Sequence, residues 1–368
     1  MGLTVYSSSI EFCAINHHGL SYCFDGVKAG SICGVVFCGT TDNMQYHKLL
    51  RILKEEVYKE IGKPVPVTLV PQYLLPHGGL SITIYALNSP ADIVTEVQDG
   101  ICYSRIESNE ESLLFIEGIA ATDFTLSVKQ QSAEVFCKLD AILTAHNFTV
   151  SDIVRQWNYI GDIVGSRMGK QNYQEFNDYR TEYYSKGDWQ NGYPAATGIG
   201  ASGKGIIVGC IACKAAAIYP IDNPLQVAAH AYSKQVLIDS RADAVKSTPK
   251  FERAKVITTS RGACCFVSGT AAIRGEQSVE GCSAAEQTLL TIENIAHLVS
   301  KENLVRHHCK PYELKYAHIQ VFIKSAEDYD AVRAVVERHY TAVPTVYTIA
   351  DVCRSELLVE IEGILTSQ

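Results

Sequence analysis

No apolar run in this 368-residue sequence approaches the roughly 18–20 residues that a membrane-spanning helix needs, so we expect no transmembrane segment. The first residues also lack a basic stretch followed by an apolar core, so we expect no secretory signal and a cytoplasmic protein. Basic residues are in the minority, with 32 Lys and Arg against 40 Asp and Glu, for a net charge of −8. This balance argues against nonspecific binding to nucleic acid or an acidic membrane. It leaves room for an anionic small molecule, because clustered arginines can outweigh the mean charge inside a cleft.

Metal-ligand spacing is also missing. Cys210 and Cys213 form a lone C-x-x-C, and on a strand these two positions face opposite sides. The run His307-His308-Cys309 has no spaced partner pair elsewhere. We therefore expect no metal site.

A glycine-rich stretch, 198–204, satisfies G-x-G-x-x-G and almost satisfies a P-loop. Both motifs require a helix after the glycines, whereas these lead into an apolar strand, and Gly205 stands where a P-loop has Ser or Thr. The stretch therefore favours a pocket wall over a nucleotide site, and no organic cofactor is expected.

What the sequence does contain is enough apolar material for a large core. Hydrophobic residues make up 47% and charged residues 20%, which is typical of a folded protein long enough for two domains. The 13 cysteines lie mostly inside apolar runs, where a reduced thiol behaves as a small hydrophobic group.

The first 150 residues alternate strands and helices. Helices are predicted over 43–62 and from 123 or 125 to 146. Strands are predicted within 3–15 and 19–38, and near 66–70, 80–87, 101–106 and 113–119. The order of these elements resembles that of the C-terminal part.

Residues 151–255 differ from both flanks because they are rich in aromatic and polar groups. The pattern predicts helices over 152–157 and 173–184, then an apolar strand over 205–217. Prolines break any periodicity in 218–255, which predicts a long loop that covers a functional site.

The stretch 256–299 is the most informative. Its strand-like run ends at Val267 and is interrupted by Ser268-Gly269-Thr270, and Ser-Gly in a strand indicates a bulge or a close approach of backbone to ligand. A helix follows over 285–299. Strands at 318–323 and 344–349, a helix at 327–340 and a last strand at 357–363 complete the expected elements.

Three features of this region resemble the Rid (YjgF) family: the Ser-Gly-Thr segment, Gln287 and Asn294 on the following helix, and Glu-Ile-Glu on the last strand. Upstream, three strings resemble the chorismatase family, whose members join a Rid-like C-terminal half to a divergent N-terminal half: Trp157–Ile160, Asn172–Arg180 and Tyr193–Gly200. The resemblance extends over about Arg155 to Gly363.

The resemblance implies an α+β fold of two Rid/YjgF-like (chorismate-mutase-like) halves, with mixed sheets and helices packed on one face. We expect a diverged N-terminal domain over 1–150, a pocket-covering segment over 151–255 and a catalytic domain over 256–368. A homo-oligomer is one option, since Rid proteins are trimers.

Glu360 is the leading candidate for an acid. It lies between apolar neighbours on the last strand, where an inward carboxyl is costly unless it is neutral or paired. Desolvation raises a carboxyl pKa, and a protonated acid at neutral pH can donate a proton. Glu362 has the same side-chain phase, and the residues alone do not choose between them. The family resemblance implies the first glutamate, Glu360.

Arginines are the expected partners of a dicarboxylate substrate, because a guanidinium pairs with a carboxylate through two parallel hydrogen bonds. The candidates are Arg180, Arg253 and Arg155, of which Arg180 ends the string Asn172–Arg180. Further substrate-binding candidates are Tyr173, Tyr159, Ser268, Gly269 and Thr270.

The implied activity is loss of pyruvate from the enolpyruvyl ether of chorismate. In the family, hydroxybenzoate-forming members have Gly in the Ser-Gly-Thr motif and Cys seven residues before the acid, whereas hydrolytic members have Ala at both places. Gly269 and Cys353 therefore favour 3-hydroxybenzoate, with Gly269 allowing close approach of the ring and Cys353 part of the catalytic site. Three alternatives stay open: hydrolysis to a dihydroxycyclohexadiene carboxylate, a Rid-type enamine/imine deaminase, and a noncatalytic metabolite-binding protein.

Overall fold

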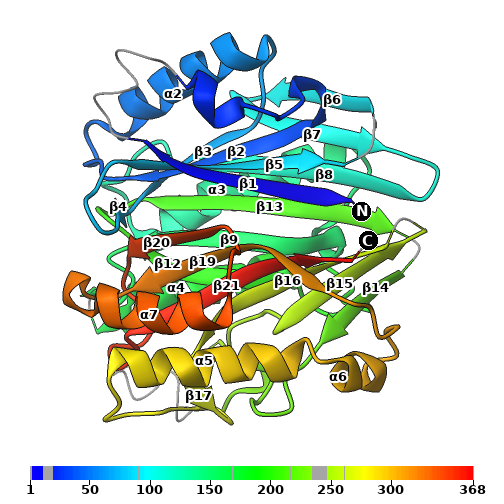
Figure 1. Ribbon diagram of the computed structural model, residues 1–368. Coiled ribbons are helices and arrows are strands. Elements are labelled where there is room, and N and C mark those ends of the chain that lie inside the picture. Colours follow the sequence, from blue (N-terminus) through cyan, green and yellow to red (C-terminus); the bar gives the residue numbers. More distant parts are fainter. Residues whose placement is uncertain are drawn as a thin grey trace.

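The computed structural model describes residues 2–10, 20–88, 92–167, 169–215, 217–233, 247–260 and 262–367. Its strands form three large sheets, each of which contains one parallel pair and is otherwise antiparallel (Figure 1). The α+β class with mixed sheets is thereby confirmed. Within the described residues, no helix is long and apolar enough to cross a membrane.

The seven-stranded sheet holds most of the C-terminal part. Its strand order is β14-β15-β16-β21-β19-β20-β4. The strands are β14 (Ala217–Ile221), β15 (Ala254–Thr259), β16 (Gly262–Ala271), β19 (Lys315–Ile323), β20 (Thr345–Ile349), β21 (Val359–Thr366) and β4 (Tyr73–Leu74). Helices α5 (Ala284–Leu298) and α7 (Tyr329–His339) lie along one face of it, and α6 (Lys301–Arg306) follows α5 (Figure 1). A capping box of Ser283 and Glu286 begins α5.

The six-stranded sheet comes from the middle of the chain, in the order β12-β9-β13-β8-β7-β6. Its strands are β6 (Asp92–Gln98), β7 (Ile101–Glu107), β8 (Glu111–Ala120), β9 (Ile153–Gly161), β12 (Ala195–Ala201) and β13 (Ile206–Ala215). Helix α3 (Val128–Ala145) packs on β8 and β13 and contacts α4 (Asn172–Tyr184).

The four-stranded sheet comes from the start of the chain, in the order β1-β5-β2-β3. Its strands are β1 (Leu3–Ile10), β2 (Ile32–Gly39), β3 (Val67–Pro71) and β5 (Leu80–Leu87). Helix α2 (Tyr46–Ile61) packs on β3 and ends at Gly62, whose φ of 77° is the left-handed conformation that glycine adopts most easily. Two short hairpins complete the strands of the described residues: β10 (Ser166–Arg167) with β11 (Lys170–Gln171), and β17 (Ile273–Arg274) with β18 (Gln277–Ser278).

One topology recurs in the three sheets. In the seven-stranded sheet, β19, α7 and a parallel β20 follow α5, and β21 then returns between β16 and β19. In the six-stranded sheet, β9, α4 and a parallel β12 follow α3, and β13 returns between β8 and β9. In the four-stranded sheet, β5 likewise returns between β1 and β2. The described residues therefore form two complete copies and one shorter copy of the same unit.

These copies differ in extent from the predicted parts. The second complete copy covers 92–215, so strand pairing crosses the boundary expected at residue 150. The expected loop 218–255 contributes the edge strand β14, which pairs with β15. Residues 234–246 of that stretch lie outside the described residues.

The helix predicted over 152–157 is wrong. After a short 3₁₀ turn at Val150–Asp152, the chain enters β9, which is buried over its whole length between β12 and β13. The polar side chains of this segment led to the prediction of a helix, but they are hydrogen-bonded inside the protein. Gln156 donates to Asn158, and Asn158 donates to the carbonyl of Thr197. Strand β6 was also missed, whereas α2, α3, α4, α5 and α7 were predicted within a few residues of their observed ends.

Candidate active site

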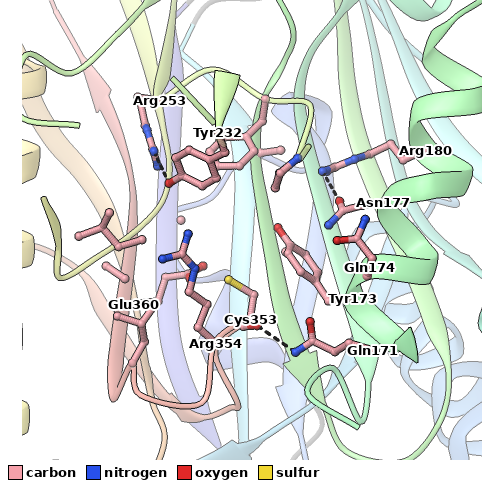
Figure 2. A pocket seen from close by; sticks show the side chains of 18 residues that line it. Gln171, Tyr173, Gln174, Asn177, Arg180, Tyr232, Arg253, Cys353, Arg354 and Glu360 are labelled. Carbon is pink, nitrogen blue, oxygen red and sulfur yellow. Dashed lines mark hydrogen bonds between the residues drawn. The ribbon is translucent and has the colours of Figure 1, made fainter. Parts of the chain in front are cut away.

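A cavity lies where the six-stranded sheet meets the seven-stranded sheet, with β12 packed against β16. It encloses about 780 Å³ of empty space, including its mouth. Figure 2 shows the side chains around it. The residues that line it are Gln171, Tyr173, Gln174, Asn177, Arg180, Ala196, Gly198, Tyr232, Pro249, Phe251, Arg253, Gly269, Ala271, Ile273, Cys353, Arg354, Leu357 and Glu360.

One wall is a face of α4. Tyr173, Asn177 and Arg180 are spaced by four and three residues, so they share one side of the helix. Arg180 is 1% exposed, and its Nη2 donates to Asn177 Oδ1 at 2.6 Å (Figure 2). Its Nε has no hydrogen-bond partner in the described structure. A buried guanidinium with a free donor is suited to an anionic group of a ligand.

The opposite wall carries two more guanidinium groups, on either side of one aromatic ring. The guanidinium carbons of Arg253 and Arg354 lie 5.5 Å and 5.4 Å from the Tyr232 ring centroid (Figure 2). Arg253 Nη2 donates to the Tyr232 hydroxyl at 2.6 Å and to the carbonyl of Val227 at 2.7 Å. Arg354 donates to the carbonyl of Glu276 and to Ser278. These contacts fix both arginines while leaving them at the cavity surface.

Glu360 reaches the cavity from β21 and is 5% exposed. Glu360 pairs with Ala271 of β16. Nearby on β16 the pairing register shifts between Val267 and Thr270, so Ser268 and Gly269 form the bulge that the sequence predicted. A Cβ added at Gly269 would overlap Glu360 Oε1 and lie 3.2 Å from Thr197 Cγ2. A methyl group at residue 269 would therefore meet the acid itself.

The environment keeps Glu360 protonated at neutral pH. Burial is the largest effect and raises its pKa from 4.5 to about 8, with the negative charge of Glu362 acting in the same direction. The guanidinium groups of Arg155 and Arg253 act against this rise. Glu360 is thus a neutral carboxylic acid in a cavity lined by cations.

Cys353 lies beside the acid, and its backbone carbonyl accepts a hydrogen bond from Gln171 Nε2 at 3.2 Å. Burial raises the pKa of its thiol to about 12, so the group is a neutral thiol and not a nucleophilic thiolate. Burial also raises the pKa of Tyr173. Both groups offer neutral surfaces to a ligand.

Several predicted residues do not line the cavity. Tyr159 is buried on β9 away from it, and the Thr270 hydroxyl donates to the carbonyl of Ser268. The Ser268 hydroxyl donates to the carbonyl of Glu252 and accepts the Ala196 N–H, so it fixes the bulge to β12. Arg155 lies behind the cavity, paired with Glu362 at 2.6 Å.

Other lining residues were missed. Gln174 and Asn177 lie in the same helical string as Tyr173 and Arg180, so helical spacing alone could have indicated them. Tyr232 and Arg354 come from irregular segments, where no periodicity points to the cavity. The glycine-rich stretch contributes Gly198, on strand β12 and not on a loop. In the described part of the chain, no cluster of His, Cys, Asp or Glu could hold a metal ion.

Comparison with known proteins agrees with the motifs. A family model described as the N-terminal region of FkbO/Hyg5-like chorismatases matches residues 87–212, close to the extent of the middle copy. A 3-hydroxybenzoate synthase of Streptomyces hygroscopicus is 35% identical over 227 residues, and a chorismatase of Streptomyces rapamycinicus is 33% identical over 220 residues.

These two alignments cover 59% and 58% of this chain and 64% of each relative, so the chain spans less than two thirds of their length. The fold is similar to that of a chorismatase crystal structure, with a TM-score of 0.72, 22% identity and coverage of 99% of both chains. This chain is therefore similar to chorismatases in part of its sequence, with the family model matching residues 87–212, and in its fold.

Proposed function

We propose that this protein converts chorismate to pyruvate and 3-hydroxybenzoate, with Glu360 as the proton donor. The observation that carries the proposal is a neutral carboxylic acid, Glu360, facing a cavity whose lining includes Arg180, Arg253 and Arg354. A dicarboxylate with an acid-sensitive enol ether fits both features. The whole protein has a net charge of −8, so a generally basic composition does not account for this local cluster of arginines.

Binding rests on the two walls. Arg180 on α4 and the pair Arg253 and Arg354 around Tyr232 can each hold one carboxylate, because they stand on opposite sides of the cavity (Figure 2). Glu360 must reach the terminal methylene of the substrate. Its position therefore decides which arginine binds the ring carboxylate and which binds the pyruvyl carboxylate. Tyr173 and Gln174 add neutral hydrogen-bonding groups on the α4 side.

The chemistry begins with transfer of the Glu360 proton to the terminal methylene. This leaves an oxocarbenium at the ether carbon and a carboxylate at Glu360, which the guanidinium groups of Arg155 and Arg253 stabilise. If the C4 hydroxyl of the ring takes part, pyruvate leaves, the ring aromatises to hydroxybenzoate and no net water is consumed. If water captures the cation, one water is consumed and the diene diol is formed. In both cases a proton returns to Glu360.

Gly269 and Cys353 support the hydroxybenzoate outcome. Both line the cavity beside Glu360, which is where water would have to enter to capture the cation. A neutral thiol is a weak hydrogen-bonding group and orders water poorly. The curated relative named 3-hydroxybenzoate synthase is consistent with this choice.

Incubation of the purified protein with chorismate tests the proposal, with pyruvate measured enzymatically and the ring products separated by chromatography. We expect equal amounts of pyruvate and 3-hydroxybenzoate. A diene diol as the ring product would replace the proposed product by the hydrolytic one and leave the proton-transfer step standing.

Absence of pyruvate would overturn the proposal. The same protein would then be assayed for ammonia release from an enamine or imine, since a Rid-type deaminase is the remaining enzymatic alternative. Saturable binding of chorismate without turnover would indicate a metabolite-binding protein.

A further inference from the structure

Glu362, two residues after Glu360 on β21, is held by three donors inside the protein. Arg155 Nη2 donates to its Oε2 at 2.6 Å, and Trp157 Nε1 donates to its Oε1 at 3.0 Å. The third donor is the Thr197 hydroxyl. The Arg155 guanidinium also lies 4.6 Å from the Trp157 ring centroid. Side chains from β9 and β12 thus fix one carboxylate of β21.

The directions of these hydrogen bonds show whether the Glu362 carboxyl is ionised or protonated. Thr197 Oγ1 accepts from Arg155 Nη2 at 2.8 Å and from the Gly269 N–H at 3.0 Å, and both of these groups can only donate. The hydroxyl proton of Thr197 must therefore point at Glu362. Every polar partner named above gives a proton to Glu362, so this carboxyl accepts in its ionised form.

This fixed charge lies next to the proposed acid. Residues two apart on a strand face the same side, so Glu360 and Glu362 both point from β21 toward the six-stranded sheet. The Thr197 hydroxyl also holds the Gly269 N–H, which the bulge leaves without a partner on β21. The network therefore controls both the charge beside Glu360 and the backbone against which its carboxyl rests.

We propose that Glu362, locked by Arg155, Trp157 and Thr197, is a positioning residue that keeps the proton on Glu360 between turnovers. Ionising two carboxyl groups that lie two residues apart on one face of a buried strand costs free energy. Glu362, which has three hydrogen-bond donors, is therefore the carboxyl that ionises. Glu360, which faces the cavity, keeps the proton. The inference rests on the proposed function, because it assigns Glu360 as the donor.

Other titratable and charged groups surround the pair and must be counted. Those on elements packed around Glu360 are Arg155, Arg253, Arg354, Arg180, Tyr173 and Cys353. Those around Glu362 are Arg155, Glu117, Tyr85, Tyr159 and Cys38. Burial is the largest effect that raises the pKa of Glu360, and the charge of Glu362 acts with it, whereas Arg155 and Arg253 favour the charged form.

The test is the pH profile of kcat/KM for pyruvate release by Glu362→Gln. Removing the negative charge while Arg155 stays should move the alkaline limb down by about one pH unit or more, with activity recovered at lower pH. A role in stability alone would reduce activity at all pH values and leave the limb in place. A limb at the wild-type position would overturn the proposal.

A double variant guards against misfolding caused by an unpaired buried arginine. In Arg155→Gln with Glu362→Gln, one charge of each sign is removed, and the limb should return toward its wild-type position. Glu337→Gln, which removes a carboxylate from the exposed pair with Arg333, is the matched control and should leave the limb unchanged. A double variant with the same shift as Glu362→Gln would contradict the proposal.

A second readout separates this inference from the proposed function. The carboxylic C=O infrared band of Glu360, isolated as wild type minus Glu360→Gln, can be titrated in the free protein. We expect that band to persist to about pH 8 in wild type and to vanish at lower pH in Glu362→Gln. If the band shifts but wild type releases no pyruvate, only the proposed function fails. If pyruvate is released and the band does not shift, only the inference fails.

Discussion

Two bulges in this protein have the same place in the repeated unit but different surroundings. In the seven-stranded sheet, Ser268 and Gly269 of β16 oppose Glu362 of β21. In the six-stranded sheet, Glu117 and Gly118 of β8 oppose Gly209 of β13, where the register shifts between Val208 and Cys210. A buried carboxyl lies at each place, Glu360 on the strand next to the first bulge and Glu117 within the second, and burial raises the pKa of each to about 8.

The two places differ in whether a ligand can reach the buried carboxyl. Beside Gly269 lies the cavity, with its three arginines. At the second bulge, Glu117 is 3% exposed and accepts a hydrogen bond from Thr68 of the four-stranded sheet, and Gly118 packs against the backbone of Val67. Aromatic side chains fill the neighbourhood, with the Tyr85 and Phe115 ring centroids 5.2 Å apart. A neutral buried acid is therefore common to both bulges, and only an open cavity with cations makes a candidate active site.

The largest expected effect contrasts the two acids. Glu360→Gln keeps the shape and removes the proton, so pyruvate release should fall by about 10²–10⁴-fold, while chorismate binding measured by calorimetry persists. Glu117→Gln should change turnover little, because that carboxyl does not reach the cavity. Near-normal turnover by Glu360→Gln would remove its assignment as the donor.

Arg180→Lys should give the next largest effect. An ammonium cannot make two parallel hydrogen bonds to a carboxylate, so kcat/KM should fall by an amount equal to roughly 1.5–3 kcal/mol. The control is Arg333→Lys on the exposed face of α7, which should have no effect. An unchanged kcat/KM in Arg180→Lys would mean that this arginine does not contact the substrate.

The pH dependence should follow the proton on Glu360. Its pKa is raised to about 8, so the protonated donor is present below that value and is lost as the pH rises through it. We expect kcat/KM to decline above about pH 8, by about tenfold per unit. A profile that stays flat well above pH 8 would show that the donor has a different pKa or a different identity.

The smallest expected effects are those of substitutions at the two bulge glycines, Gly269 and Gly118, which should change different properties. Gly269→Ala with Cys353→Ala should shift the ring product toward the diene diol, because the added methyl displaces Glu360 and loss of the sulfur leaves room for water. Chromatography measures the product ratio, and pyruvate should form in both proteins. An unchanged ratio would show that these two residues do not set the product.

Gly118→Ala should act on stability instead. Gly118 has a φ of 70°, and its Cβ would meet the backbone carbonyl of Val67, which cannot rotate away. The expected cost is roughly 1–3 kcal/mol of unfolding free energy in a denaturant titration, with the product ratio unchanged. A product change in Gly118→Ala would contradict the separation of the two bulges.

The sequence by itself determined those features that depend on neighbouring residues. The amphipathic helices, the strands of the C-terminal sheet and the Ser268-Gly269 bulge follow from local period and from glycine placement. The motif residues Arg180, Tyr173 and Glu360 were also available from the sequence, through the family resemblance.

Only the tertiary structure decided the rest, because it depends on which strands become neighbours. Strand β9 is a strand, and not a helix, because β12 and β13 flank it and its polar groups find partners there. Arg155 was expected to hold the substrate, but β9 directs it to Glu362, 207 residues away along the chain. Glu360 and Glu362 have the same side-chain phase, and the donors on β9 and β12 are what distinguish them. No local pattern encodes those donors, since long-range packing brings them to the carboxyl.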